Sequence, residues 1–363
     1  MWCLSEFVII QLKVWFDKVL ITVCKRFYRK EPYVVKMILS NIEPIHIDGL
    51  NCFEEAVLSV IGILYSDYYI LFWDRWGFSY NVRKNKKYMG ELINRGINGL
   101  LPNLEMLYGI KVKKIKIDGK LSCLGFIKET IKNDIPLITF MDTFCCPWHR
   151  DYKKEHHVHY LVIVGVEREE KLICVDATFL KRDVLLPIEL FWQGAYECEH
   201  EDFSQLFGIY VFDFLNIKDV DTRKNEAHQM MIGKMIRNSI YKDVLLFAGD
   251  FKESFDFKHE YEKFAINITD VPMDRHLGLI SGQRVLFSYF LQIMQYQNID
   301  IVREMLILLA KKWKGLRFEL RKCFYTGFTE EKQEKLYESI IQLAYMEKKA
   351  VQRFIENFNG DVI

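Results

Sequence analysis

The chain has 363 residues, of which 50% are hydrophobic and 15% aromatic, so it can bury a large core and is expected to form two domains. Lys and Arg total 50 against 49 Asp and Glu, so no overall charge draws the protein to nucleic acid or to an anionic membrane. The nine cysteines are odd in number and scattered through apolar segments, which argues against a small disulfide-stapled secreted domain and favours the cytoplasm.

The N-terminal part of the chain contains an apolar run, FVIIQLKVWFDKVLITVC, at residues 7–24. Polar residues interrupt this run at Gln11, Lys13, Asp17 and Lys18. We therefore expect no membrane anchor. Residues 1–39 are interpreted as an N-terminal helical extension. Met37 offers an alternative start, in which case residues 1–36 would be dispensable.

A helix is predicted to begin directly after Asn51. Asn is a favoured N-cap residue, and Glu54 stands at the third helical position, where its side chain can complete a capping box. Apolar residues then recur at helical spacing at Ala56, Val57, Val60, Ile61 and Leu64. Cys52 is therefore expected to open a helix.

From Pro44 to about residue 216, helical and strand patterns alternate, as they do in a mixed α and β domain. A helix is expected at 121–133. The expected strands are 109–117, 135–141, 159–166, 171–176 and 208–214. The sequence EREE joins the third and fourth of these strands and is typical of a hairpin connection.

From about residue 217, long stretches with a 3.6-residue period replace the strand patterns. These stretches are 224–248, 281–296, 299–325 and 329–358. The predicted fold class is therefore α+β, with a mixed domain at 40–216 followed by an all-helical domain at 217–363.

Cys52 is a candidate nucleophile because a thiol at a helix N-terminus lies at the positive end of the peptide dipoles, which favours the thiolate. Glu54 and Glu55 oppose this effect, so a nearby imidazolium is needed. His159 is the candidate base, since it begins a strand. Asp176 ends the next strand and, if the two strands form a hairpin, lies at the same end of the ladder, where it can orient the imidazole.

Each of these three residues also has a purely structural interpretation. A lone Cys in an apolar helix usually packs as a small core residue. A His at a strand start is usually a polar end residue, and an Asp after a strand is usually a turn former. Spacing alone leaves these alternatives open.

Two stretches carry a resemblance to a known family, GLNCFEEAVLSVIG at 49–62 and PLITFMDTFCCPWHRDYKKEHHVHYLVIVGVEREEKLICVDATF at 136–179. Together with the helical C-terminal half, they resemble the butirosin biosynthesis protein H family. The most specific part of the match runs from Asp142 through PWH and Tyr152 to Asp176. The resemblance covers most of residues 40–350.

The resemblance implies a papain-like domain of the cysteine-protease type at 40–216, followed by a helical domain. It implies an acyltransferase of secondary-metabolite biosynthesis that takes an acyl group from an acyl carrier protein and passes it to a small-molecule amine. Cys52, His159 and Asp176 are the catalytic positions by this match. The chain would need no cofactor of its own, because the partner protein carries the phosphopantetheine.

Two positions depart from the pattern of the resembling proteins. The family commonly has His-Cys where this chain has Asn51 and Cys52. Related papain-like enzymes have a Gln six residues before the nucleophile that donates to the oxyanion, whereas this chain has His46. Since a His can donate a hydrogen bond, His46 is the candidate oxyanion donor.

The run CCPWHRDYKKEHHVH also suggests a metal site, because zinc prefers thiolates and imidazoles. Its candidate ligands are Cys145, Cys146, His149, His156, His157 and His159. The spacing matches no standard zinc pattern and no second CxxC is present, so we expect no metal. Instead, Pro147 and Trp148 are expected to shape a loop over the active site, with Asp142, His149 and Tyr152 fixing that loop or contacting substrate.

Other residues are candidates for binding substrate or partner. Trp76 and Tyr80, in an aromatic stretch, could wall a substrate channel or belong to a core. The basic runs at 83–87 and 311–322 could meet an acidic carrier protein or simply be solvated.

Three functions therefore compete on the sequence alone. The first is the acyltransferase. The second is a cysteine peptidase of the same fold, and the third is a binding module without catalysis. The chemistry of Cys52 distinguishes the two enzymes from the third.

Overall fold

The structure is a computed structural model. It describes residues 39, 41–82, 86–167, 170–198, 203, 205–214, 216–237, 239–261, 264, 268–296 and 298–359. The predicted N-terminal extension, apart from residue 39, lies outside the described residues. Within the described part of the chain, no helix has the length and apolar character needed to cross a membrane.

The chain divides into two compact units. The first is built from the segment ending at Ile47, Asn51–Tyr68 and Leu101–Asp219. The second is built from Asp48–Leu50, Tyr69–Leu100 and the chain from Val220 onward. Residues 69–100, which the sequence interpretation assigned to the first domain, thus belong to the unit that contains the C-terminal helices.

A six-stranded sheet forms the centre of the first unit. In spatial order its strands are β3 (Lys111–Ile115), β8 (Ile209–Asp213), β4 (Leu137–Asp142), β5 (Val158–Glu167), β6 (Lys171–Asp176) and β7 (Lys181–Pro187). All neighbouring strands run antiparallel. The predicted hairpin of β5 and β6 is confirmed, with Val162 opposite Val175.

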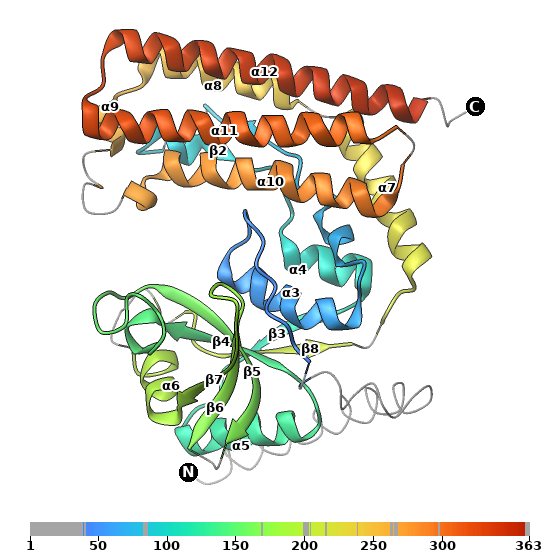
Figure 1. Ribbon diagram of the computed structural model, residues 1–363, viewed down its shortest axis with the longest axis vertical. Helices are drawn as coiled ribbons and strands as arrows, with labels where there is room; N and C mark the ends of the chain where they lie inside the picture. Colours follow the sequence, from blue (N-terminus) through green and yellow to red (C-terminus); the bar gives the residue numbers. More distant parts are fainter. Residues whose placement is uncertain are drawn as a thin grey trace. The chain divides into compact units, whose positions relative to one another are not determined.

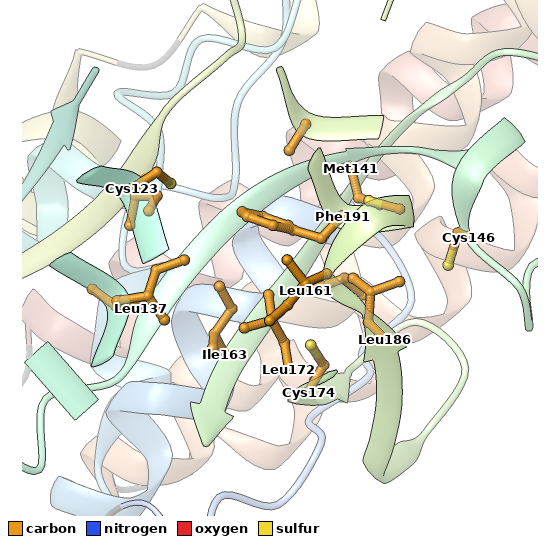
Figure 2. Close-up of a cluster of buried hydrophobic side chains, with 14 of the residues drawn as sticks. Cys123, Leu137, Met141, Cys146, Leu161, Ile163, Leu172, Cys174, Leu186 and Phe191 are labelled. Carbon is orange, nitrogen blue, oxygen red and sulfur yellow. The ribbon is translucent and has the colours of Figure 1, made fainter. Parts of the chain in front are cut away.

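One face of this sheet carries the core of the first unit. Leu161 and Ile163 alternate along β5, so their side chains lie on the same face. The helices α5 (Lys120–Lys132) and α6 (Ile188–Ala195) pack against the sheet there and contribute buried residues that include Phe191. Figure 2 shows this cluster around Leu161. His159, two residues before Leu161, lies on the same face of the strand, where the strand begins.

The helix α3 (Cys52–Leu64) packs against the other face of β5 through aromatic side chains. The ring centroid of Phe53 lies 4.9 Å from that of Tyr160 and 4.8 Å from that of Tyr210 on β8. These contacts place the first turn of α3 beside the beginning of β5 (Figure 1).

Short elements complete the two units. They are η1 (Tyr68–Phe72), β1 (Ser79–Tyr80), η2 (Met89–Leu92), β2 (Ile93–Asn94), α4 (Leu100–Asn103), the π-helix η3 (Leu104–Tyr108), η4 (Thr143–Cys145) and η7 (Ile268–Asp270). The strands β1 and β2 form a separate antiparallel pair.

The second unit is mainly helical. Its helices are α7 (Val220–Ile236), α8 (Ile240–Ser254), α9 (Phe257–Tyr261), α10 (Pro272–Met294), α11 (Asp300–Thr326) and α12 (Glu330–Asn359). The predicted stretch 224–248 is divided between α7 and α8, and the other three stretches correspond to α10, α11 and α12. The latter three lie side by side (Figure 1). A mixed α and β fold with a helical C-terminal region is thus confirmed.

A buried carboxylate joins several segments of the second unit. Glu347 of α12 accepts hydrogen bonds from the indole nitrogens of Trp76, at 2.8 Å, and Trp313, at 2.9 Å. Arg284 of α10 donates to it through Nε at 2.9 Å and through its guanidinium to the carbonyl oxygen of Gly77 at 3.0 Å. Residues 69–100 belong to this unit because Trp76 and Gly77 take part in this network.

A second buried carboxylate accounts for part of the basic run 311–322. Asp274 of α10 is fully buried and accepts hydrogen bonds from Arg317 at 2.8 Å and from Arg321 at 2.7 Å. These two arginines therefore stabilise the packing of α11 on α10. The lysines at 311, 312 and 314 are exposed. Of the other basic run, residues 83–85 lie outside the described residues.

We predict that Glu347→Gln lowers the free energy of unfolding by about 3 kcal/mol or more, because it leaves the charge of buried Arg284 without its partner. Chemical denaturation followed by tryptophan fluorescence measures this change. Glu330→Gln, at the exposed start of α12, is the control and should change stability by less than about 0.5 kcal/mol. Equal effects of the two substitutions would contradict the importance of the network.

Candidate active site

Cys52 is the first residue of α3, where the predicted capping box is confirmed. The Oδ1 atom of Asn51 accepts a hydrogen bond from the backbone N–H of Glu54 at 3.0 Å. In return, the carboxylate of Glu54 accepts one from the backbone N–H of Asn51 at 3.2 Å. Asn51 therefore fixes the point at which the helix begins, and with it the position of the half-buried thiol.

The fold brings Cys52 to the beginning of β5. Its Sγ atom lies 3.8 Å from the carbonyl oxygen of Val158, the residue before His159. The thiol is close enough to the imidazole of His159 to affect its pKa. The contact joins the first turn of a helix to the start of a strand, as the sequence interpretation required.

His159 and Asp176 form a buried pair, with exposed fractions of 2% and 0%. The Nε2 atom of His159 lies 2.8 Å from Oδ2 of Asp176. Because Nε2 faces this carboxylate, the Nδ1 atom is the ring nitrogen left for Cys52. The three predicted catalytic residues are thus brought together in the order thiol, imidazole, carboxylate.

Two further groups hold the carboxylate of Asp176 in place. The indole nitrogen of Trp148 donates to Oδ2 at 2.7 Å, and the backbone N–H of Phe179 donates to Oδ1 at 3.2 Å. Both oxygens of Asp176 therefore accept hydrogen bonds, which compensates for the burial of its charge. Trp148, predicted to shape a loop over the site, contacts the carboxylate directly.

The surroundings favour a protonated His159 beside an ionised Asp176. Burial alone lowers the pKa of His159, but hydrogen bonds with Asp176 and Cys52 and the negative charges of both raise it to about 9. Burial alone raises the pKa of Asp176, but the hydrogen bond and charge of His159 and the hydrogen bonds from Trp148 and Phe179 lower it below its usual range. An imidazolium beside the thiol is the condition that a reactive cysteine needs.

His149 forms an aromatic neighbour of the base. Its ring centroid lies 5.3 Å from that of His159 and 4.9 Å from that of Phe179. Its Nδ1 atom accepts a hydrogen bond from the backbone N–H of Asp151 at 3.1 Å. Burial and the positive charge of His159 lower the pKa of His149 below its ordinary value.

His46 lies against the helix that carries the nucleophile. Its Nδ1 atom is 2.5 Å from the buried carboxylate of Glu55, which also accepts a hydrogen bond from the Thr178 hydroxyl at 2.8 Å. Burial raises the pKa of Glu55. Glu55 lies one helical turn after Cys52, so the two residues share a face of α3. The role of His46 as an oxyanion donor stays a prediction.

The remaining predicted binding residues lie in different surroundings. Tyr152 is half-buried in the turn after His149, where its backbone N–H donates to the carbonyl oxygen of His149 at 3.0 Å. Asp142 is buried and holds its own loop through the backbone N–H of Phe144 at 3.1 Å. Trp76 and Tyr80 are buried in the second unit, where Tyr80 donates to Asp250 at 2.9 Å. The contact of these four residues with substrate stays a prediction.

None of the seven cysteines in the described part of the chain forms a disulfide bond there. Burial raises the pKa of Cys145 to about 11 and that of Cys146 to about 12. Cys146 belongs to the core cluster under α6 and is labelled in Figure 2. Cys145 and Cys146 of the candidate metal run therefore contribute to the packing of the core.

The sequence interpretation did not assign Glu55, Thr178 or Phe179 to the site. Phe179 follows Asp176 by three residues, and the Asp side chain accepts from its backbone, a local pattern that is typical of an Asp after a strand. That pattern was available in the sequence. The contact of Thr178 with Glu55 joins distant segments, and no local sequence pattern predicts it.

A scan against models of known protein families finds no match to this chain, and a search of curated proteins finds no significant match either.

We predict that Asn51→Ala lowers the free energy of unfolding by about 1 kcal/mol, because the N-cap acceptor is lost. Asn51→Ser keeps a capping oxygen without placing a second negative charge beside Glu54, and it should lose only a small part of that amount. Denaturation curves of the two variants test the capping box. A similar loss in both variants would show that Asn51 stabilises the helix by another contact.

We also predict that the stability of the protein depends on the proton of His159. The pKa is raised from 6.5 to about 9 on folding, so the stabilisation is complete below about pH 6.5 and is lost as the pH rises through about 9. Asp176→Asn removes a carboxylate that raises this pKa. We therefore expect the free energy of unfolding to change less between these pH values in the variant than in the parent.

Denaturation at both ends of this pH range provides the measurement. Asp183→Asn removes an exposed carboxylate from β7 and is the matched control. It should show the same pH dependence as the parent. An unchanged pH dependence in Asp176→Asn would contradict the coupling of Asp176 to His159.

Proposed function

We propose that the chain is a cysteine-dependent acyltransferase with a papain-like first domain. The single observation that supports this most strongly is the buried, hydrogen-bonded pair of His159 and Asp176 beside the thiol of Cys52 at the first turn of α3. The resemblance to the butirosin biosynthesis protein H family supplies the reaction class. The proposal covers the acyl carrier protein as donor and a small-molecule amine as acceptor.

In the first half of the reaction, the Cys52 sulfur attacks the carbonyl carbon of the carrier thioester and forms a tetrahedral oxyanion. The oxyanion collapses, the bond from carbon to the carrier sulfur breaks, and His159 gives its proton to the departing thiolate. The products are the free carrier thiol and an acyl group attached to Cys52. Ionised Asp176 keeps the imidazole oriented throughout.

In the second half, the amine nitrogen attacks the carbonyl carbon of the Cys52 thioester. His159, neutral after the first half, takes a proton from the nitrogen as the new bond forms. The bond from carbon to the Cys52 sulfur then breaks, and an amide is released. The thiolate and imidazolium are thereby restored for the next cycle.

Stabilisation of the oxyanion is assigned to backbone and side-chain donors at the start of α3. The backbone N–H of Cys52 lies in the first turn, where helical N–H groups have no acceptor within the helix. The macrodipole of α3 adds favourable charge at the same point. His46, held by Glu55, is the proposed side-chain donor.

The nature of the partners follows from the resemblance. The carrier protein brings the phosphopantetheine, so the proposed reaction needs no cofactor bound to this chain. A cytoplasmic location would suit a protein that meets such a carrier. The exposed lysines at 311, 312 and 314 are one candidate surface for it.

The experiment is incubation of the full chain with an acylated carrier protein, followed by intact mass measurement and peptide mapping. We predict an added acyl mass on Cys52 that disappears when an amine acceptor is supplied. Cys52→Ala should carry no acyl group. Cys323→Ala, a cysteine of α11 in the second unit, is the control and should be acylated like the parent.

Two outcomes would redirect the proposal. Cleavage of peptide substrates that requires Cys52, without transfer to any amine, would assign the same residues to a cysteine peptidase. Absence of any adduct on Cys52 in a folded chain would favour a binding module.

A further inference from the structure

Three side chains from separate segments of the first unit converge beside the active-site loop. They are Asp142 at the end of β4, His156 just before β5 and Cys198 after α6. Their ligand atoms all lie within 4.8 Å of one another. We propose that these three residues form a zinc-binding site.

The ligand atoms of His156 and Cys198 both lie close to one carboxylate oxygen of Asp142. Oδ2 of Asp142 is 2.6 Å from Nδ1 of His156 and 3.0 Å from Sγ of Cys198. Around a tetrahedral zinc ion with bonds of about 2.0–2.3 Å, neighbouring ligand atoms lie roughly 3.3–3.7 Å apart. The two distances from Oδ2 of Asp142 therefore need to lengthen by only about 0.5–0.7 Å to admit the ion, and Nδ1 of His156 and Sγ of Cys198 already lie within 4.8 Å of each other.

The carboxylate at the centre of the group is fixed in advance. Asp142 is 1% exposed, and its other oxygen, Oδ1, accepts a hydrogen bond from the backbone N–H of Phe144 at 3.1 Å. This bond turns Oδ2 toward His156 and Cys198. A carboxylate held in this way can bind a metal through one oxygen without further ordering.

The imidazole is oriented by an aromatic contact. The ring of Phe144 stacks on that of His156, with centroids 4.5 Å apart and an angle of 10° between the planes. The stacking fixes the plane of the imidazole, and the contact with Oδ2 of Asp142 at 2.6 Å turns Nδ1 toward the carboxylate. His156 is exposed and Cys198 is half-buried, so an ion can reach both side chains from solvent.

The chemistry of the three donors fits zinc better than a hard cation. One sulfur, one imidazole nitrogen and one carboxylate oxygen suit zinc, whereas magnesium and calcium prefer oxygen ligands. When Cys198 binds through sulfur, its thiol proton passes to solvent. The resulting thiolate and the carboxylate of Asp142 together balance the charge of the ion. A water molecule would occupy the fourth position.

This group differs from the metal site considered from the sequence. Of the cysteines and histidines in CCPWHRDYKKEHHVH, only His156 belongs to it, and Cys198 comes from beyond the next three strands and α6. No local spacing connects Cys198 to the other two residues. The group emerges only because the chain after α6 returns to the end of β4.

The position of the site gives the ion a role in the first unit. Asp142 and His156 lie at the two ends of the segment that carries Trp148, the donor to Asp176. A bound ion would fix both ends of this segment to the chain after α6. We expect zinc to stabilise the loop that supports the catalytic pair, without contact with the reacting atoms. This inference does not rest on the proposed acyl transfer.

Binding of zinc to the full chain tests the site directly. Protein stripped with a chelator is titrated with zinc chloride, and the metal content and the melting temperature are measured. We expect one equivalent to bind and the melting temperature to rise. Cobalt(II) in place of zinc should give a charge-transfer absorption band that reports a bond to a thiolate.

Four variants decide where the ion binds. Cys198→Ser and His156→Gln should each weaken binding by more than about 100-fold, since loss of even an outer-shell partner costs 10–100-fold. His157→Gln and Cys323→Ser remove a histidine that lies next to the site in sequence and a distant thiol, and they should bind like the parent. Circular dichroism checks that each variant is folded.

Two results would overturn the inference. One is the absence of stoichiometric binding by the folded parent. The other is equal binding by all four variants, which would show adventitious association elsewhere on the chain.

Discussion

The arrangement of the site depends on one buried oxygen atom. Oδ2 of Asp176 accepts hydrogen bonds from the imidazole of His159 and from the indole of Trp148. Because the carboxylate is buried, its negative charge attracts the imidazolium strongly. For the same reason, leaving this charge without hydrogen-bond partners would destabilise the fold. The same interaction therefore holds the loop that carries Trp148 and keeps the proton on His159. Cys52 gains a protonated neighbour only because this carboxylate is already satisfied and ionised.

The geometry of the sheet brings Cys52, His159 and Asp176 together although they come from separate segments of the chain. Pairing of β5 with β6 sets the start of one strand beside the end of the other, and the contact of Phe53 with Tyr160 sets α3 across them. The nucleophile is then positioned by an N-cap, which fixes the residue at which the helix begins. Secondary structure thus sets the backbone position of all three functional groups, while the loop that carries Trp148 holds the carboxylate of Asp176.

Local patterns in the sequence were sufficient for the helix start at Asn51, the β5 and β6 hairpin and the helical character after residue 217. They also made Cys52, His159 and Asp176 candidates, since each lies at an end of an element that periodicity predicts, but spacing alone left their structural interpretations open and the resemblance was needed to select them. The burial of Trp76 against Glu347 was not predictable, because the two residues are far apart in the chain and an aromatic stretch suits a channel as well as a core. The approach of Cys198 to Asp142 was missed for the same reason. Contacts between distant segments are set by packing, which no short pattern records.

The account requires that Cys52 and His159 act as one unit. The most direct measurement is the rate at which iodoacetamide, an uncharged reagent, alkylates Cys52 at neutral and at high pH in the parent and in His159→Gln. The account predicts that the substitution slows alkylation at least about tenfold at neutral pH, and that the two rates converge at high pH, where the thiol ionises without help. Equal rates at neutral pH in two folded proteins would contradict it.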